Sequence, residues 1–141
     1  MAENSEMNQL LTFSSGEDIF GFDIKSVQDI IEIPDITPLP MVAEYICGIM
    51  NLRGKAVPVM DFAGRMGFEP AVYDKHSCVV VIDCDGSPLG VKVEKVIDAE
   101  LYQSDRLIPS PVERSCIKGY LETDEKRIAV IDCIIFSEKN K

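Results

Sequence analysis

Side chains suited to catalysis are few in this sequence, and they are poorly placed. The single histidine, His76, lies in a polar stretch two residues before Cys78. General bases are most often histidines, and nucleophilic triads orient them with an Asn or Asp, for which the surroundings of His76 offer no pattern. We therefore interpret His76 as a surface residue and predict that the chain is not an enzyme. A thiol-dependent enzyme that uses Cys78 or Cys116 is an alternative, but it lacks a plausible base.

Ligands for a metal ion are equally sparse. A zinc site built from His76, Cys78 and Cys84 would lack a fourth ligand and the close ligand pairs that such sites use. Asp61 and Asp132 could form a carboxylate pair, but each lies at the same place in two similar halves of the chain. That placement indicates a structural role at the end of a strand. We predict no metal and no cofactor.

The residues most suggestive of binding are Asn51-Leu52-Arg53-Gly54. They place an apolar side chain, Leu52, beside the planar guanidinium of Arg53. Arginine is favoured at protein interfaces because its guanidinium makes paired hydrogen bonds and stacks on flat groups. The same residues also suit a plain turn, with Gly54 in a backbone conformation that other residues avoid and Arg53 in solvent. The tetrapeptide alone leaves both interpretations open.

A duplication in the chain helps to separate these interpretations. Two sets of residues from the first half recur at nearly equal spacings. Ile46, Gly48, Lys55, Val59 and Asp61 return as Ile117, Gly119, Lys126, Val130 and Asp132 at a spacing of 71 (117 − 46), and 20–24 returns as 89–93 at a spacing of 69 (89 − 20). A repeat seen only twice is no solenoid, so we predict one fold made of two similar halves. The hairpin tip of the second copy is Glu122-Thr123-Asp124-Glu125, which has no apolar or basic residue. This difference favours a specialised role for Asn51-Leu52-Arg53-Gly54.

Composition narrows the class of protein. The 141 residues, 46% apolar and 27% charged, are typical of one soluble globular domain. The net charge of −10 argues against nucleic acid or an anionic membrane as the partner and is compatible with a basic protein partner. The polar N-terminus does not resemble a signal peptide and the apolar runs are too short to span a bilayer, so we expect no membrane insertion. Five cysteines without close pairs indicate reduced thiols in a cytoplasmic protein: Cys47, Cys78, Cys84, Cys116 and Cys133.

Short strands separated by turn residues predict an all-β fold. Strands are expected at 10–13, 19–22, 56–62, 79–82, 89–93 and 127–132. Asp85-Gly86 predicts a tight hairpin turn between two of them. Pro58 cannot donate a hydrogen bond to a neighbouring strand, so we expect its strand at an edge or locally irregular. Single helical turns are expected at 24–28, 41–45 and 63–67.

Two copies of this strand pattern predict two small barrels within a single domain, 1–141. We expect residues 17–75 to form the first barrel, and 76–137 with the N-terminal strand 7–14 to form the second. A core of this size is marginal when it stands alone, so the barrels should pack together or exchange a strand.

The stretch 45–62 resembles the signature of the CheW-like chemotaxis coupling family. That signature is an Ile and a Gly, then Asn-Leu-Arg-Gly as in 51–54, then an apolar strand with a Pro and a terminal Asp as in 56–62. The resemblance covers about residues 7–137 and includes further blocks: 22–24, 27–30, 89–91, Val93, Val96 and Asp98. It implies two small five-stranded SH3/OB-like barrels with strand exchange, packed around a shared core, with few short helical turns.

The resemblance also implies a function. Members of this family are non-enzymatic adaptors that join the cytoplasmic helical tips of chemoreceptors to the regulatory domain of the histidine kinase CheA. A member would be cytoplasmic and recruited to receptor arrays at the inner membrane. Because no kinase or receiver segment is matched, a free-standing coupler is favoured over a kinase fragment or a CheV-type fusion. The alternative is a small-ligand or oligosaccharide-binding β-barrel, but such sites need aromatic platforms, and the chain has no Trp and only 7% aromatic residues.

Carried over to this sequence, the family's receptor-binding region maps to one block and one hairpin. The matching residues are Val27, Gln28, Ile30, Gly48, Asn51, Leu52 and Arg53. Asp29 stands where the family usually has Glu, and we hypothesise that Asp29 forms an ion pair with Arg53 that holds the hairpin. The surface that meets the kinase should include the ends of both barrels, and the resemblance assigns no residues to it.

Overall fold

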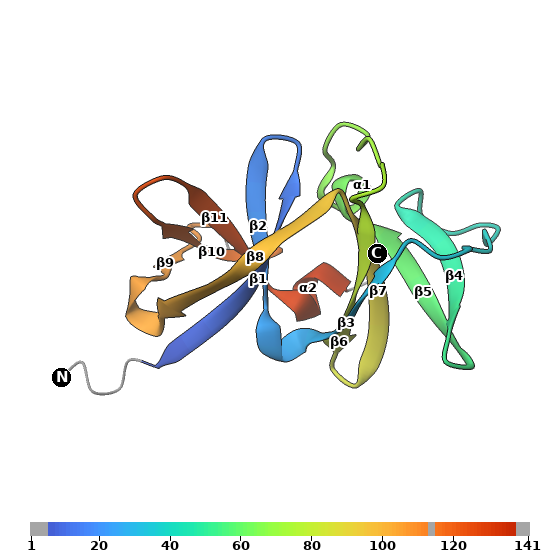
Figure 1. The fold of residues 1–141 in the computed structure, drawn as a ribbon, viewed down its shortest axis with the longest axis horizontal. Coiled ribbons are helices and arrows are strands. Elements are labelled where there is room, and N and C mark those ends of the chain that lie inside the picture. Colours follow the sequence, from blue (N-terminus) through green and yellow to red (C-terminus); the bar gives the residue numbers. More distant parts are fainter. Residues whose placement is uncertain (1–5, 113–114, 138–141) are drawn as a thin grey trace.

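The computed structural model describes residues 6–112 and 115–137, and they form two sheets joined along a central seam (Figure 1). Barrel A is a six-stranded sheet in the order β8-β1-β2-β11-β10-β9. Its strands are β1 (Met7–Ser15), β2 (Asp18–Asp23), β8 (Lys95–Gln103), β9 (Ile108–Pro109), β10 (Ile117–Glu122) and β11 (Arg127–Ile131). Barrel B is a five-stranded sheet in the order β3-β6-β7-β5-β4. Its strands are β3 (Val27–Glu32), β4 (Ile46–Leu52), β5 (Lys55–Asp61), β6 (Cys78–Cys84) and β7 (Ser87–Val93).

Within residues 6–112 and 115–137, helical structure is confined to four short pieces. They are η2 (Ile24–Ser26), α1 (Phe62–Met66), η3 (Ser104–Arg106) and α2 (Cys133–Ser137). Asp61 and Asp132 start the two α-helices: Asp61 accepts the N–H of Gly64 at 2.9 Å, and Asp132 accepts the N–H of Ile134 at 3.0 Å. Both carboxylates thus satisfy helix N–H groups that have no partner within the helix. The structural role predicted for this pair is confirmed.

The two copies exchange their first hairpins. Hairpin β1–β2 of the first copy lies in barrel A, where β2 pairs in parallel with β11 of the second copy and Gly21 faces Val130. Hairpin β6–β7 of the second copy lies in barrel B, where β7 pairs in parallel with β5 and Gly90 faces Val59. The expected strand exchange is therefore present.

The sheets divide the chain differently from the expected halves 17–75 and 76–137. Residues 18–23 belong to barrel A and residues 78–93 to barrel B, because each hairpin leaves its own copy for the other. The all-β fold of two small barrels is confirmed, with a sixth, two-residue strand in barrel A. In barrel B the position equivalent to β9 is the single bridge between Thr37 and Ile49.

The exchanged strands are buried on both faces, which accounts for their unbroken apolar sequences. In β6, Val79 and Val81 point into the interior of barrel B, while Val80 and Ile82 point into a core shared by the two barrels. All four side chains have 0% exposure. A strand that is covered on both faces has a continuous run of apolar residues, whereas a strand with one face in solvent alternates apolar and polar residues.

The shared core is rich in phenylalanine. Phe13 packs edge-on against Phe62 at 4.8 Å between ring centroids, and Phe22 lies 4.9 Å from Phe13. Phe136 of α2 stacks on Phe62 of α1 at 5.7 Å, so both helices close over the seam. Each barrel also has a small interior core of its own, built in barrel A from Leu10, Tyr102, Leu121, Ile128 and Val130.

One local expectation was wrong, and the one for Pro58, an edge strand or a local irregularity, was met only in its second form. The segment 41–45 is a turn and not a helix, because Met41 has φ +59, which ends any right-handed helix. Pro58 lies on an interior strand, β5, and not at an edge. A proline fits at this position for two reasons. On one side, the pairing of β5 with β7 begins only at Val59. On the other side, the N–H and the carbonyl of Ile49, which lies opposite Pro58, both form hydrogen bonds with Thr37 and need no partner on Pro58.

Gly48 sits at a bulge of β4 where the chain passes under Thr37. Its φ is +144, and a Cβ there would lie 2.0 Å from the carbonyl oxygen of Thr37. Gly119 holds the same position in β10, with the carbonyl of Ile108 at 2.6 Å from an added Cβ. The two glycines are kept because the crossing segment leaves no room for a side chain.

We expect Gly48→Ala to lower the free energy of unfolding by more than about 4 kcal/mol, because both the backbone angle and the close carbonyl oppose a methyl group. Gly67→Ala is the matched control, since Gly67 has a left-handed φ of +79 but open space around it. That substitution should cost about 1–2 kcal/mol. Urea denaturation of both variants measures the difference, and equal costs would contradict the close approach.

Candidate functional site

The tip of hairpin β4–β5 is a two-residue turn. Arg53 and Gly54 occupy its centre, with φ angles of +53 and +84. The side-chain oxygen of Asn51 accepts the N–H of Gly54 at 2.9 Å and braces the turn. Asn51 is therefore occupied within the hairpin, and Arg53 is the residue that the turn presents to solvent.

Hairpin β6–β7 shows what this turn prefers. Its central residues are Asp85 and Gly86, with φ angles of +56 and +90, and the carboxylate of Asp83 accepts the N–H of Gly86 at 3.0 Å. Asp, Asn and Gly tolerate the left-handed region, whereas other side chains lose on the order of 1 kcal/mol or more there. Arg53 is thus a poor choice for the turn itself, and the identity of this residue needs another explanation.

Arg53 forms the ion pair with Asp29 that is expected from the sequence. Its Nη2 donates to Oδ2 of Asp29 at 3.0 Å. The other carboxylate oxygen of Asp29 accepts the N–H of Ile30 at 2.9 Å, which fixes the acid at the bulge of β3. Because β3 and β4 are the two edges of the sheet, the pair ties one edge of barrel B to the hairpin at the other.

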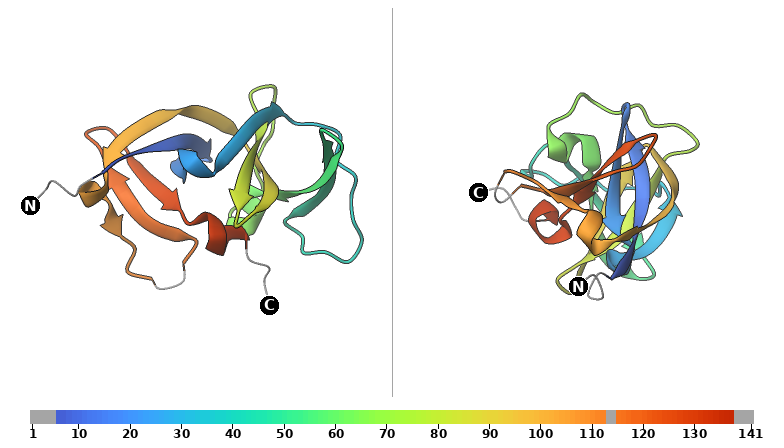
Figure 2. Two further views of the ribbon diagram at one scale, coloured as in Figure 1. Left: turned by 90° about the horizontal axis from the view of Figure 1, so that it is seen from below. Right: turned by 90° about the vertical axis from the view of Figure 1, so that its left-hand side faces the viewer.

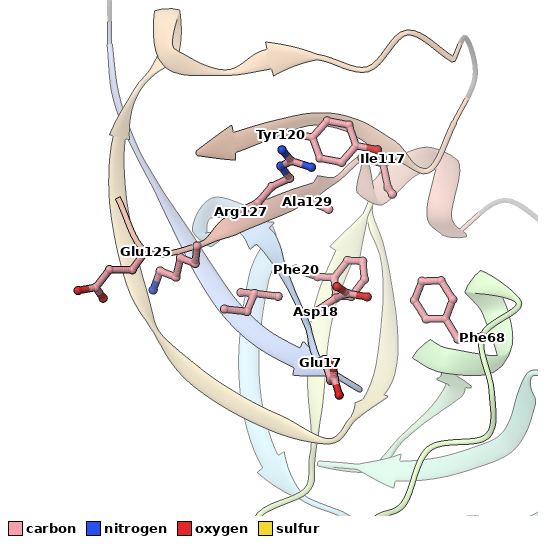
Figure 3. Close-up of a pocket in the computed structure, with 11 residues that line it drawn as sticks. Glu17, Asp18, Phe20, Phe68, Ile117, Tyr120, Glu125, Arg127 and Ala129 are labelled. Atoms are coloured by element: carbon pink, nitrogen blue, oxygen red, sulfur yellow. The ribbon is translucent and has the colours of Figure 1, made fainter. Parts of the chain in front are cut away.

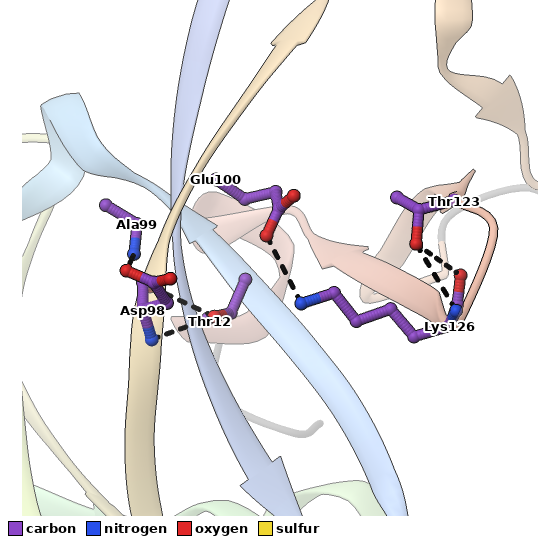
Figure 4. Close-up of polar contacts among 6 residues, drawn as sticks. All are labelled: Thr12, Asp98, Ala99, Glu100, Thr123 and Lys126. Carbon is purple, nitrogen blue, oxygen red and sulfur yellow. Dashed lines mark hydrogen bonds and ion pairs between the residues drawn. The ribbon is translucent and has the colours of Figure 1, made fainter.

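Barrel A is closed by a similar pair that is much less exposed. Nζ of Lys126 lies 3.2 Å from the carboxylate of Glu100, and the two side chains are 28% and 27% exposed (Figure 4). Arg53 is 80% exposed and Asp29 26%. An exposed pair contributes about 0–1 kcal/mol, so stability does not require that Arg53 be held here. Most of the guanidinium of Arg53 is free to meet a partner.

Strand β3 presents alternating side chains to solvent beside this pair. Gln28 and Ile30 lie on its outer face, and Ile30 is 43% exposed. Val27 is half-buried and packs against the shared core at the seam. The residues predicted from the early block are thus brought beside Arg53, with Ile30 outward and Val27 at the junction of the barrels.

Two of the remaining predicted residues, Gly48 and Leu52, face inward, whereas Asn51 is exposed. Leu52 packs against the interior core of barrel B, and Gly48 is buried under Thr37. Together with Asn51 they shape and position the hairpin. Among the predicted residues, Gln28, Ile30, Asn51 and Arg53 are thus exposed on this side of barrel B, with Val27 at the margin.

A second exposed strip was missed from the sequence. Ile97, Ala99 and Leu101 lie on the outer face of β8, and Ile97 and Leu101 are 41% and 63% exposed. In the duplicated copy, Ile97 is equivalent to Gln28, Ala99 to Ile30 and Leu101 to Glu32. Strands β3 and β8 lie on the same side of the molecule, one on each barrel (Figure 2). Strand β8 could have been found in the sequence, because Ile97, Ala99 and Leu101 alternate with the acidic residues Asp98 and Glu100.

The cysteines are free thiols, and their surroundings do not favour a nucleophile. Burial raises the pKa of Cys47, Cys78 and Cys84, and burial raises the pKa of Cys133 to about 11. A higher pKa leaves less of the reactive thiolate at neutral pH. The alternative of a thiol enzyme that uses Cys78 is weakened by this burial.

Neither a metal cluster nor a membrane helix is found in the part of the chain that the structure describes. Within residues 6–112 and 115–137, no three His, Cys, Asp or Glu side chains gather in a way that could hold a metal ion. Among the same residues no helix has the length and apolar character needed to cross a membrane.

Comparisons with known proteins match this chain over nearly its full length. The model of the CheW-like domain family matches residues 9–136. The chain is 28% identical to "Chemotaxis protein CheW" of Treponema pallidum (strain Nichols), over 99% of this chain and 88% of that protein. It is 30% identical to "Probable chemotaxis protein CheW" of Rhizobium etli, over 96% of this chain and 91% of that protein. Its fold is similar to the crystal structure of the scaffolding protein TtCheW from Thermoanaerobacter tengcongensis, with a TM-score of 0.89, 29% identity and coverage of 96% and 95%.

The two barrel-closing pairs should respond differently to mutation. Arg53→Asn removes an exposed ion pair but relieves the left-handed turn, so the free energy of unfolding should change by less than about 0.5 kcal/mol. Lys126→Asn removes a pair in which the cation is also largely buried, 28% exposed against 80% for Arg53, and should cost about 1–2 kcal/mol. Chemical denaturation of both variants checks this, and a larger loss for Arg53→Asn would make Arg53 a structural residue.

The thiol of Cys133 should react slowly in the native protein. At pH 8 we expect alkylation by iodoacetamide at least about tenfold slower at Cys133 than in the urea-unfolded chain, because its folded pKa is raised and its thiolate is scarce. The native rate should rise with pH up to about 11, whereas the unfolded rate levels off nearer pH 9. Peptide mass spectrometry after timed labelling reports each cysteine, and a native rate equal to the unfolded rate would contradict the assignment.

Proposed function

This chain belongs to the family of CheW-like domains, and we propose that it is a chemotaxis scaffold that couples chemoreceptors to the histidine kinase CheA. Its task is association, and no catalytic step is assigned to it. In this proposal the chain works in the cytoplasm and is recruited to receptor arrays at the inner membrane. The receptor contributes its cytoplasmic helical tip, and the kinase contributes its regulatory domain.

The observation that carries the proposal is the placement of Arg53. This residue occupies a turn position that suits Asn or Asp better, and its guanidinium is 80% exposed. It stands beside Ile30, an apolar side chain on the outer face of an edge strand. An amphipathic helix binds such a surface by laying its apolar side on the strand, while a flanking charge fixes its register.

The predicted receptor-binding residues then divide into two roles. Ile30, Gln28 and Arg53 would contact the receptor helix, with Val27 supporting it where the barrels meet. Gly48, Asn51 and Leu52 would act as positioning residues, because one is buried, one braces the turn and one packs inside barrel B. Asp29 orients Arg53 through their ion pair.

The kinase would bind at a separate place. Both partners must be held at once by a coupling protein, so their surfaces cannot overlap. We propose that the regulatory domain of CheA meets the ends of the barrels, away from the outer face of β3. This division makes the two associations separable by mutation.

We expect Ile30→Asp to weaken binding of a purified receptor tip at least tenfold, a loss of about 1.4 kcal/mol, because it places a charge on the apolar contact. Binding of the CheA regulatory domain should change less than about twofold. Isothermal titration with each partner measures both. Ile134→Asp is the matched control, since Ile134 is a similarly exposed isoleucine on α2.

Thermal unfolding of both variants confirms that they are folded. If the wild-type protein bound neither partner, the coupling function would be refuted. If Ile30→Asp and Ile134→Asp weakened receptor binding equally, the receptor surface would lie elsewhere.

A further inference from the structure

The duplication builds two surface grooves at equivalent positions, one on each barrel. Groove A has a volume of about 570 Å³ and its floor is formed by Phe20, Ile117 and Ala129. Groove B has a volume of about 460 Å³, and its floor is formed by the equivalent residues Leu89, Ile46 and Pro58. Groove B is lined by no charged residue among those described, whereas charged residues surround groove A. The rim of groove A is therefore particular to one copy.

Groove A contains an aromatic side chain held rigidly at its edge. The N–H of Phe68 donates to the carbonyl of Ala63 at 2.8 Å, and Gly67 before it adopts the left-handed conformation that ends α1. The ring of Phe68 lies 5.6 Å from that of Phe20, yet Phe68 is 41% exposed (Figure 3). A fixed, half-exposed aromatic ring is a favourable anchor for a binding partner, because the side chain loses little conformational entropy when the partner binds.

The rim of groove A is acidic once its internal pairs are counted. Lys126 is paired with Glu100, and Arg127 is paired with Glu122 at 2.6 Å. On the opposite lip, the turn between β1 and β2 carries two acids that also line the groove: Glu17 and Asp18. Neither of these acids forms an ion pair within residues 6–112 and 115–137. The uncompensated charge at the groove is negative.

This charge selects among possible occupants. Nucleic acid, an anionic membrane and a second copy of this chain, with its net charge of −10, would all be repelled by the rim. A positively charged segment that carries an apolar side chain would be attracted by the rim and received by the floor. We propose that groove A binds a basic peptide segment of a partner protein, which inserts one apolar or aromatic side chain beside Phe20 and Phe68.

Groove A is distinct from the receptor surface argued above. It is formed by β2, β10, β11 and the segment after α1, whereas that surface lies on β3 and the β4–β5 hairpin. The inference therefore does not depend on the receptor surface, and the two can fail separately.

The test uses a short fluorescein-labelled peptide in which lysines flank one phenylalanine. Wild-type protein should bind this peptide, and should bind versions with glutamate flanks or with alanine at the centre at least tenfold more weakly. The double variant Glu17→Lys, Asp18→Lys should also bind the lysine peptide at least tenfold more weakly. The matched control is Asp35→Lys, Asp105→Lys, which makes the same change in charge at exposed acids outside the groove and should stay within twofold.

Backbone amide spectra locate the peptide independently. Shifts on addition of the lysine peptide should be concentrated at Phe68, Tyr120 and Ala129. The proposal is overturned if the wild-type protein does not bind the peptide, if both double variants lose binding equally, or if the shifts lie elsewhere. The affinity of the double variant Glu17→Lys, Asp18→Lys for the receptor tip should stay within twofold of wild type. A larger loss would make groove A part of the receptor surface and would overturn the proposal that it is a separate site.

Discussion

The exchange of two hairpins is the constraint on which the rest of this structure depends. Hairpin β1–β2 completes barrel A and hairpin β6–β7 completes barrel B, so each sheet is built from both copies. Because β6 is buried on both faces, removing it from barrel B would open the interior of that barrel and the shared core together. Neither copy can therefore fold as an independent barrel. The two outer faces at β3 and β8 are consequently held at a fixed distance and angle, which a binding surface that spans two units requires.

The duplication also shows which positions were free to change. Gly48 and Gly119 are fixed by a crossing strand, and Asp61 and Asp132 by the helices that they start. Hairpin tips and groove rims have no such constraint, because they end in solvent. The copies differ in this way at Arg53 and in the charges around groove A. At such positions a new side chain costs the shared scaffold little.

The sequence predicted features that depend on local chemistry and failed where distant strands choose their partners. Turn residues and the duplication were sufficient for the hairpins and the short helices at 24–26 and 62–66, and the family resemblance added the pairing of Asp29 with Arg53. The barrel to which each hairpin belongs was not predictable. The local sequence is equally compatible with β2 pairing within its own copy and with the observed parallel pairing, in which Gly21 faces Val130 of the other copy. Strand β8 was missed because Ile97 and Leu101 point outward, which reverses the usual relation between apolar residues and burial.

Under the proposed function, the arginine at position 53 is a local cost accepted for recognition. The left-handed backbone there disfavours a long side chain by on the order of 1 kcal/mol or more, and the exposed pair with Asp29 returns about 0–1 kcal/mol. Stability alone would favour the Asp-Gly turn that the chain uses in hairpin β6–β7. In barrel A the closing cation is Lys126, which is only 28% exposed and serves the barrel itself. Local rules that are broken without a gain in stability are typical of functional sites, and in the proposed function the gain lies in the contact of Arg53 with the receptor.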